Sequence, residues 1–89
     1  MARTRPMPAR PFPSTEYFQK VRLRPDRAKI RDEWILRAIA SPLREHVQAD
    51  NRVRLWSPVP EAGGRILRVV VLVDRQTVHN AFFDRTFRP

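Results

Sequence analysis

The sequence predicts a small α+β domain, an antiparallel sheet of four to five strands with one or two short helices packed on one face, in the order β-α-β-β-β-β. Three observations predict this class. Apolar residues between Asp26 and Ala40 recur at helical spacing, and the chain from residue 43 onward alternates with a period of two. At 89 residues the chain can bury one hydrophobic core only.

The N-terminal residues 1–13 are basic and proline-rich. They interleave prolines with arginines, namely Pro6, Pro8, Pro11 and Pro13 with Arg3, Arg5 and Arg10. This composition offers too little apolar surface to offset the entropy of ordering it. We therefore expect a disordered or extended arm over 1–13 and a single folded domain over 14–89. The arm either adds phosphate contacts or is a leader without a function of its own.

A first strand is predicted directly after the arm. Over residues 17–24 the side chains alternate, with Tyr17, Gln19, Val21 and Leu23 on one face and Phe18, Lys20, Arg22 and Arg24 on the other. Pro25 ends this strand. Tyr17 and Arg24 are candidate RNA-binding residues on it.

A helical segment follows between Asp26 and Ala40, either as one helix or as a turn followed by a helix that begins near Arg31. Its apolar residues at helical spacing are Ile30, Trp34, Ile35, Ala38 and Ile39. Acidic residues in the first turn favour a start near Arg31, and Ser41-Pro42 ends the helix.

The remaining strands are predicted at 43–48, 52–57, 65–74 and 77–84, separated by turns at 50–51, 63–64 and 75–76. Gly63 and Gly64 are the only glycines, and they supply the positive φ of a hairpin turn. The segment 65–74 is apolar on both faces apart from Arg68, which predicts a central strand. The sheet face without a helix needs a cover, which the arm, a partner or an RNA could provide.

Composition narrows the function. The chain carries a formal charge of +9, with no cysteine and sixteen arginines among eighteen basic residues. The absence of cysteine excludes a disulfide scaffold, a thiol nucleophile and a Cys-ligated metal site. The charge favours a polyanion partner, and guanidinium suits phosphate, although GC-rich coding DNA also raises the arginine content. No apolar segment is long enough for a bilayer or a secretory signal, so we expect a soluble cytoplasmic protein without a membrane partner.

The excess charge lies at both ends of the chain. Residues 1–24 carry a net +5, residues 25–50 are neutral and residues 51–89 carry +4. The neutral middle is the helical segment, so the basic charge of the folded part belongs mainly to the predicted sheet.

Known catalytic patterns are scarce. His46 and His79 lie far apart in the sequence and no carboxylates have ligand spacing, so neither a metal nor another cofactor is expected. The chain has no glycine-rich phosphate loop and no nucleophile elbow. With these classes of site excluded, a metal-free site built from Arg, His and Tyr side chains is the arrangement that the composition still allows.

Arg68 is the most informative residue, because a charge within an apolar central strand is costly unless it is paired or faces a polar cavity. It either forms a salt bridge with Asp84 or Glu33, or lies on the floor of the sheet and binds a phosphate.

Three other residues are candidates. Arg54 and Trp56 share a strand face, where Trp56 either stacks on a base or packs in the core. His79, in the last strand, either exchanges a proton at neutral pH or is a half-buried structural residue.

The segment GRILRVVVLVDRQTVHNAFFDRTF resembles the closing hairpin of RelE/ParE-superfamily toxins, in which an Arg-bearing strand is followed by a turn, a strand and a terminal Arg shortly before an aromatic residue. RPDRAKIRDEWILRAIASP resembles the helical segment of BrnT-type toxins of that group. The resemblance covers residues 15–88 and implies a RelE-like fold.

The resemblance implies a metal-independent endoribonuclease that cuts mRNA, often on the ribosome, and is silenced by an acidic antitoxin. Arg68 and Arg85 match the family arginines that clamp the phosphate, and His79 completes the catalytic set. The sequence departs from the family at Phe87, where many RelE-type nucleases carry a Tyr that exchanges a proton. His79 or Tyr17 would then replace it as acid or base.

Three hypotheses follow. The first is a toxin-like ribonuclease, monomeric or weakly dimeric when free, that attacks the phosphate with the ribose 2′-hydroxyl. The second is a catalytically silent module that binds nucleic acid or an acidic protein on the same basic sheet. The third is an interaction protein whose open sheet face or edge meets a partner.

Overall fold

The computed structural model describes residues 11–88. Three short helices, α1 (Glu16–Val21), α2 (Pro25–Ala28) and α3 (Asp32–Ala40), precede four strands. The strands are β1 (Arg44–Val47), β2 (Val53–Val59), β3 (Arg65–Val71) and β4 (Val78–Phe83), and the 3-10 turn η1 (Pro60–Ala62) lies between β2 and β3. All neighbouring strands are antiparallel, in the order β1-β2-β3-β4. The predicted α+β class is confirmed, with an order of helices followed by strands.

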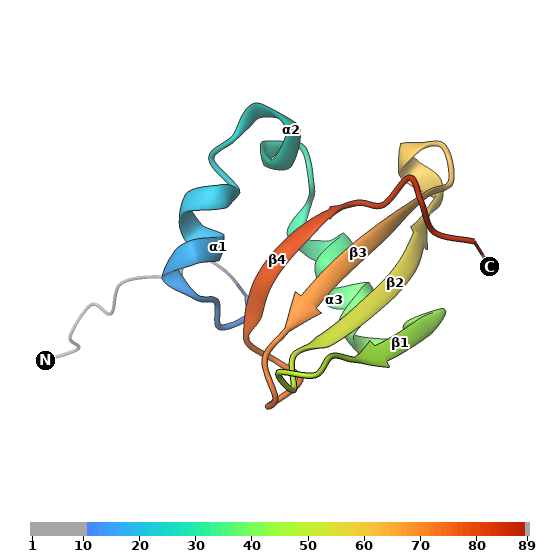
Figure 1. The fold of residues 1–89 in the computed structure, drawn as a ribbon. Coiled ribbons are helices and arrows are strands. Elements are labelled where there is room, and N and C mark those ends of the chain that lie inside the picture. Colours follow the sequence, from blue (N-terminus) through green and yellow to red (C-terminus); the bar gives the residue numbers. More distant parts are fainter. Residues whose placement is uncertain (1–10, 89) are drawn as a thin grey trace, which may run out of the picture.

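The helix α3 lies behind the sheet, against β2 and β3, and α1 lies beside β4 (Figure 1). The core is the layer between α3 and the sheet. It contains Ile35 and Ala38 of α3 together with strand residues that face them, among them Leu55, Leu67, Val69, Val71 and Ala81. No helix of residues 11–88 lies over the other face of the sheet, which we call the open face.

The predicted first strand is wrong, because residues 16–21 form the helix α1. The Thr15 hydroxyl caps it by accepting the Phe18 backbone N–H, and Glu16 in the first turn suits the positive end of the helix dipole. Phe18 and Val21, three residues apart, are the buried pair. Leu23, assigned to the apolar strand face, is 78% exposed. The hydrophobic residues at 17, 18, 21 and 23 are compatible with the period of a strand and with that of a helix. The Thr15 cap favours the helix.

The packed part of the chain begins before the predicted boundary at residue 14. Phe12 is buried in the core, with its ring centroid 6.2 Å from that of Phe18. The Val78 backbone N–H donates to the Pro13 carbonyl, and the Thr15 N–H donates to the Val78 carbonyl. Residues 11–15 are therefore tied to the outer edge of β4, whereas residues 1–10 of the expected arm lie outside the described part of the chain.

The helical segment divides into α2 and α3, with α3 beginning one residue after Arg31. This matches the alternative of a turn followed by a helix. The turn at Gly63 and Gly64 is confirmed, with φ of 74° and 80°. A substituted Cβ would meet nothing at either glycine, so the backbone angle alone requires glycine there.

β2 continues through Pro58, beyond the predicted strand end at residue 57. Pro58 pairs with Ile66 of β3, while β1 reaches only as far as Trp56 along the other side of β2. The missing N–H of the proline therefore falls where β2 has no outer neighbour, so no sheet hydrogen bond is lost there.

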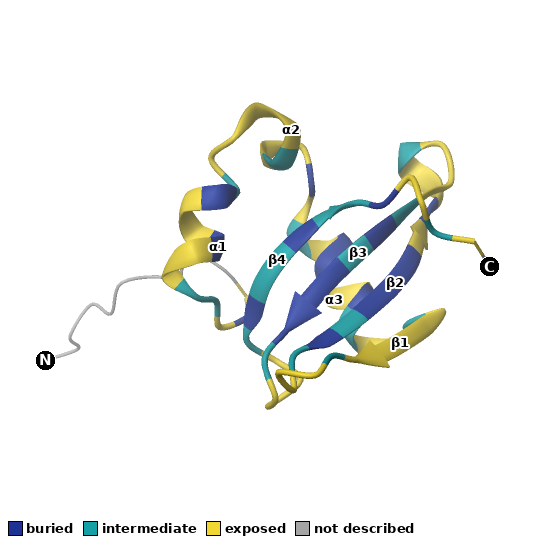
Figure 2. Ribbon diagram, in the orientation of Figure 1, coloured by how far each residue is buried: buried dark blue, intermediate teal, exposed yellow. Residues whose placement is uncertain are grey.

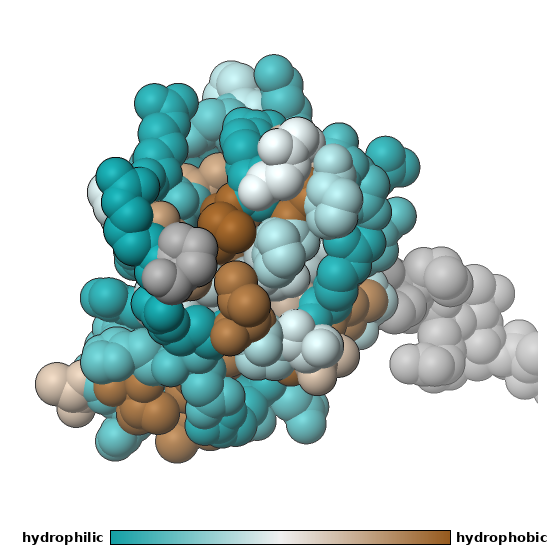
Figure 3. All heavy atoms as spheres, turned by 90° about the vertical axis from the view of Figure 1, so that its right-hand side faces the viewer, coloured by the Kyte–Doolittle hydropathy of each residue, from teal (hydrophilic) through white to brown (hydrophobic). Residues whose placement is uncertain are grey.

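Burial differs from strand to strand across the sheet (Figure 2). β2 and β3 are largely buried, whereas all four residues of β1 are exposed. Seen from the right-hand side of Figure 1, the apolar residues form small separate patches among hydrophilic ones (Figure 3). Within residues 11–88, no helix is long and apolar enough to cross a membrane.

Candidate nucleic-acid interface

Two cross-strand rows build the open face. Arg44, Trp56, Arg68 and Phe82 are paired across the four strands in one row, and His46, Arg54, Val70 and Asn80 in the next. Residues opposite each other in an antiparallel sheet share a face. The same register places Leu55, Val69 and Ala81 together on the core face. Arginine and aromatic side chains thus gather on the face that α3 does not cover.

A β-bulge in β4 determines where His79 lies. Val70 pairs with Asn80, but the next residue of β3, Val71, pairs with Val78, so His79 is the extra residue. Val78 and Ala81 are both buried, whereas His79 and Asn80 between them are only half-buried. A regular strand would turn one of these two side chains into the core. The bulge releases both from it, a use typical of bulges beside functional sites.

α1 holds the His79 ring from one side. The Tyr17 ring stacks on the imidazole with centroids 4.9 Å apart and planes inclined by 23°. Thr15 Oγ1 lies 3.1 Å from His79 Nδ1, and it also accepts the Phe18 N–H that begins α1. Either imidazole tautomer satisfies this contact, because a hydroxyl can donate once and accept twice. The capping residue of α1 therefore also fixes the orientation of the histidine.

The electrostatic surroundings of His79 favour its neutral form. Burial lowers the pKa of His79 below its ordinary value of 6.5, and the positive charge of Arg52 lowers it further, against a weaker opposite effect of Asp50. A neutral imidazole at pH 7 can accept a proton, which suits a general base.

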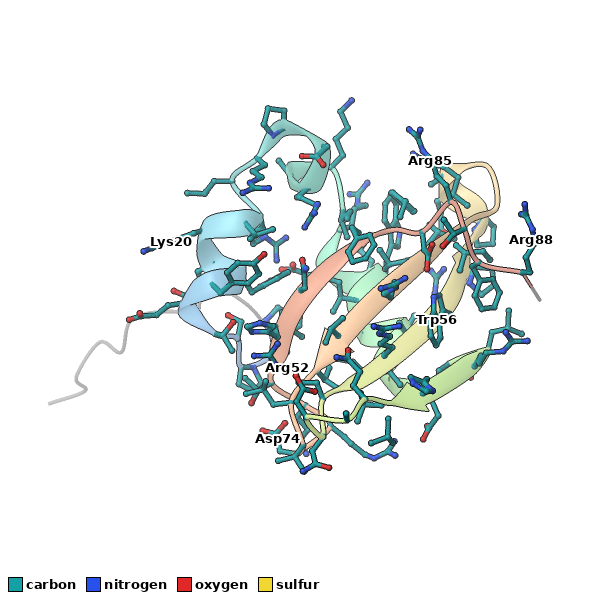
Figure 4. All side chains as sticks on the ribbon, in the orientation of Figure 1. Lys20, Arg52, Trp56, Asp74, Arg85 and Arg88 are labelled. Atoms are coloured by element: carbon teal, nitrogen blue, oxygen red, sulfur yellow. The ribbon has the colours of Figure 1, made fainter. Side chains whose placement is uncertain are left out.

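Tyr17, Arg54, Arg68 and His79 line one shallow hollow of about 450 Å³, which we call the His79 hollow. Its other lining residues are Gln48, Arg52, Val70, Asn80 and Phe82. The structure thus brings together four residues of the seven-residue site that the sequence predicts. Figure 4 shows Arg52 at the end of the sheet near the β1–β2 turn.

The arginines of the hollow differ in how far their charge is neutralised. Arg54 Nε donates to the amide oxygen of Gln48 at 3.1 Å, a neutral partner that leaves its charge uncompensated. Arg52 lies 3.6 Å from a carboxylate oxygen of Asp50, with 43% of its side chain exposed. Both guanidinium groups keep most of their capacity to attract a phosphate, because exposed ion pairs are weak.

Arg68 is held by a carboxylate. Its Nε and Nη2 both donate to Asp84 Oδ2, at 3.1 and 2.8 Å, and the Asp84 side chain is only 5% exposed. Of the alternatives for Arg68, the structure contains the salt bridge to Asp84. Arg68 therefore contributes mainly structure and a neutralised charge to the hollow.

Trp56 has a packing role and does not present its ring for base stacking. It is 7% exposed, its Nε1–H donates to Asp84 Oδ2 at 2.9 Å, and the Phe87 ring lies 5.5 Å from it. Phe87, the position where the resemblance implies a tyrosine, thus covers the tryptophan. Phe87 also contacts Arg44, whose guanidinium lies 4.9 Å from the centre of the Phe87 ring.

Besides Trp56, two predicted residues lie outside the His79 hollow. Arg85, after the end of β4, lines a second hollow beside Arg27, Arg65 and Phe83. Arg24 is exposed at the N-cap of α2 and lines neither hollow. The catalytic set of Arg68, Arg85 and His79 is therefore divided between two places.

Sequence reasoning missed Arg52 and Thr15, and it left Asp84 as one of two possible partners of Arg68. Their roles depend on the cap of α1, the bulge of β4 and the pairing of β3, none of which a sequence pattern displays. A Ser-Thr-Glu run before an aromatic residue was the available signal for Thr15. Among residues 11–88, no three His, Asp or Glu side chains are grouped so that they could hold a metal ion.

Comparison of the chain with protein-family models, curated proteins and solved structures gives no significant match.

Proposed function

We propose that the chain is a toxin-like endoribonuclease that binds single-stranded RNA on the open face and cleaves it in the His79 hollow. One observation carries the proposal. Tyr17, Arg54 and His79, which come from three distant parts of the sequence, line the same hollow. They combine a neutral imidazole, an uncompensated cation and an aromatic ring. The toxin class is supported by the resemblance of residues 24–42 and 64–87 to RelE/ParE-type proteins.

The proposed reaction is the attack of a ribose 2′-oxygen on the adjacent phosphorus. The O2′–P bond forms and the P–O5′ bond breaks, which leaves a 2′,3′-cyclic phosphate and a 5′-hydroxyl. His79 Nε2 takes the proton of the 2′-hydroxyl. This requires the tautomer in which Nδ1–H donates to Thr15 Oγ1, because only then does Nε2 carry a free lone pair.

The other side chains of the hollow supply the remaining requirements. The Arg54 guanidinium balances the charge that develops on the phosphate oxygens, and Arg52 adds a second cation nearby. Tyr17 gives a proton to the leaving 5′-oxygen, and its half-exposed ring offers a surface on which a base can stack. Arg68 stays paired with Asp84 and holds the floor of the hollow.

The test is cleavage of a defined single-stranded RNA by the purified protein, with identification of the product ends. We expect 2′,3′-cyclic phosphate ends from the wild type, and loss of cleavage in His79→Asn and Arg54→Ala with their circular dichroism spectra unchanged. Lys20→Ala is the matched control for the charge change, because Lys20 is exposed on α1 and points away from the sheet (Figure 4). RNA that stays intact with the wild type contradicts the enzymatic proposal.

A second candidate is a catalytically silent RNA-binding module. The salt bridge of Arg68 to Asp84 favours it, because a neutralised arginine gives little help to a phosphorane. In this case the RNA binds with a steep dependence on salt and is not cut. An acidic antitoxin that covers the open face would compete with the RNA under either candidate, and added RNA should then weaken its binding.

A further inference from the structure

The second hollow, which we call the Arg85 hollow, has a volume of about 460 Å³ and lies between α2, the start of β3 and the segment after β4. Arg27, Arg65 and Arg85 line it together with Phe82 and Phe83. Arginine beside aromatic rings is the composition that grooves for single-stranded nucleic acid share. Nothing in the proposed cleavage step uses this hollow.

The Arg85 hollow carries an excess of positive charge. Within the part of the chain that the structure describes, Arg85 has neither a hydrogen-bond nor an ion-pair partner. Arg65 donates from Nε to the Ala62 carbonyl, and its guanidinium lies over the Phe83 ring at 4.0 Å. Neither arginine has a carboxylate partner, so both charges are available to a ligand.

The two carboxylates of the hollow do not cancel this excess. Asp26 lies 3.4 Å from Arg27 Nε. Asp84 accepts from Trp56 and Arg68 on Oδ2, and from the backbone N–H and hydroxyl of Thr86 on Oδ1. Each acid is thus matched by an arginine of its own, and the charges of Arg65 and Arg85 are left over.

Phe82 connects the two hollows, because its side chain lines both. The guanidinium groups of Arg27 and Arg68 lie over its ring, at 5.2 and 4.8 Å from the centre. In Figure 4, Arg52 and Arg85 lie toward opposite ends of the sheet. Arg65 and Phe83 share the register of the core-face residues Val59 and Leu67. A strand bound in the His79 hollow therefore reaches the Arg85 hollow across Phe82 and over the sheet edge that β4 forms.

We propose that the Arg85 hollow is a phosphate subsite for the same RNA strand, several nucleotides away from the bond that is cut. This inference rests on the proposed function. Arg85 and Arg65 bind backbone phosphate there, so Arg85 positions the strand and does not clamp the reacting phosphate. A chain that fills both hollows gains affinity because the second contact is intramolecular.

The experiment measures fluorescence anisotropy with 2′-O-methyl oligoribonucleotides, which a 2′-hydroxyl attack cannot cut, of about 4 and about 12 nucleotides. We expect Arg85→Ala to weaken binding of the longer strand about tenfold, the order of one charge-assisted contact. The slope of its log affinity against log salt should fall by about 0.7. The affinity of Arg85→Ala for the shorter strand should equal that of the wild type. Lys20→Ala should bind both strands with wild-type affinity.

Three results would overturn the inference. If Arg85→Ala binds both strands with the same affinity as Lys20→Ala, Arg85 does not form a phosphate subsite. Binding of the RNA by the wild type would still support the proposed function. Equal weakening of both strands places Arg85 with the nucleotides of the His79 hollow. If the wild type binds neither strand, the proposed function fails and the subsite fails with it.

Discussion

Arg68 donates two hydrogen bonds to a single carboxylate oxygen of Asp84, which also accepts the indole N–H of Trp56. Burial by itself would raise the pKa of Asp84, but the hydrogen bonds from Thr86, Trp56 and Arg68 outweigh it and hold this pKa well below its usual range. The carboxylate therefore stays ionised and links β2, β3 and the segment after β4. This contact explains how a charge can lie in the central strand.

Asp84→Ala should destabilise the protein by about 3 kcal/mol, because it leaves Arg68 without its partner in a largely covered position. The measurement is urea unfolding followed by circular dichroism. Glu61→Ala is the control, since it removes an ion pair of similar length, with Arg37, at 40–49% side-chain exposure. An equal loss of stability in the two variants would show that Asp84 does not compensate a buried charge.

Cleavage should depend on pH through His79. The base must be neutral, and its pKa is lowered, so the acidic inflection of the rate should lie below pH 6.5. Arg52→Gln removes a positive charge that lowers this pKa, and it should therefore shift the inflection upward, toward 6.5. Single-turnover rates across pH measure it. Arg37→Gln on α3 is the control, because it removes one positive charge far from His79. An equal shift of the inflection in this variant would refute the assignment of the inflection to His79.

Thr15→Ala should remove both the cap of α1 and the contact with His79 Nδ1. We expect a loss of about 1 kcal/mol in the free energy of unfolding, typical of a lost cap. Cleavage should fall as well, through kcat, because the imidazole loses its orientation. Thr15→Ser keeps the hydroxyl and should restore both properties. A Ser variant as impaired as the Ala variant would show that the hydroxyl is not the cause.

Phe12→Ala should destabilise the domain by about 3 kcal/mol, as expected for a large side chain removed from a core. Thermal unfolding measures this loss. Leu23→Ala, at a position that is 78% exposed, should change the stability by less than about 0.5 kcal/mol. If Phe12→Ala is equally silent, residues 11–13 are not part of the packed domain.

The sheet could be predicted because its signals are local. β3 is apolar on both faces over a short run, and the only two glycines mark the turn before it. The sequence predicts a strand where α1 forms, because the hydrophobic residues there fit the period of a strand as well as that of a helix, and the Thr15 cap depends on one hydrogen bond. The core position of Phe12 was missed for a related reason, since composition alone does not reveal contact with Phe18.

The candidate site was predictable only as a set of residue types. Arg54 and Arg68 follow from strand alternation, and Asp84 was one of two partners considered for Arg68. The choice between them depends on the pairing of Arg68 with Phe82, two residues before Asp84. The exposure of His79 depends on the bulge opposite Val70 and Val71, a property of two strands together. The pairing of Arg68 and the bulge at His79 both depend on two neighbouring strands, so the sequence of a single strand does not reveal them.

The proposed function requires that the RNA be cut in the His79 hollow by attack of its own 2′-hydroxyl. The most direct measurement compares one single-stranded sequence as RNA and as its 2′-O-methyl analogue, each incubated with the wild-type protein. We expect both strands to bind with similar, salt-dependent affinity, and only the RNA to be cut, to 2′,3′-cyclic phosphate ends. Equal binding with both strands intact, or cleavage of the analogue, would contradict the proposed function.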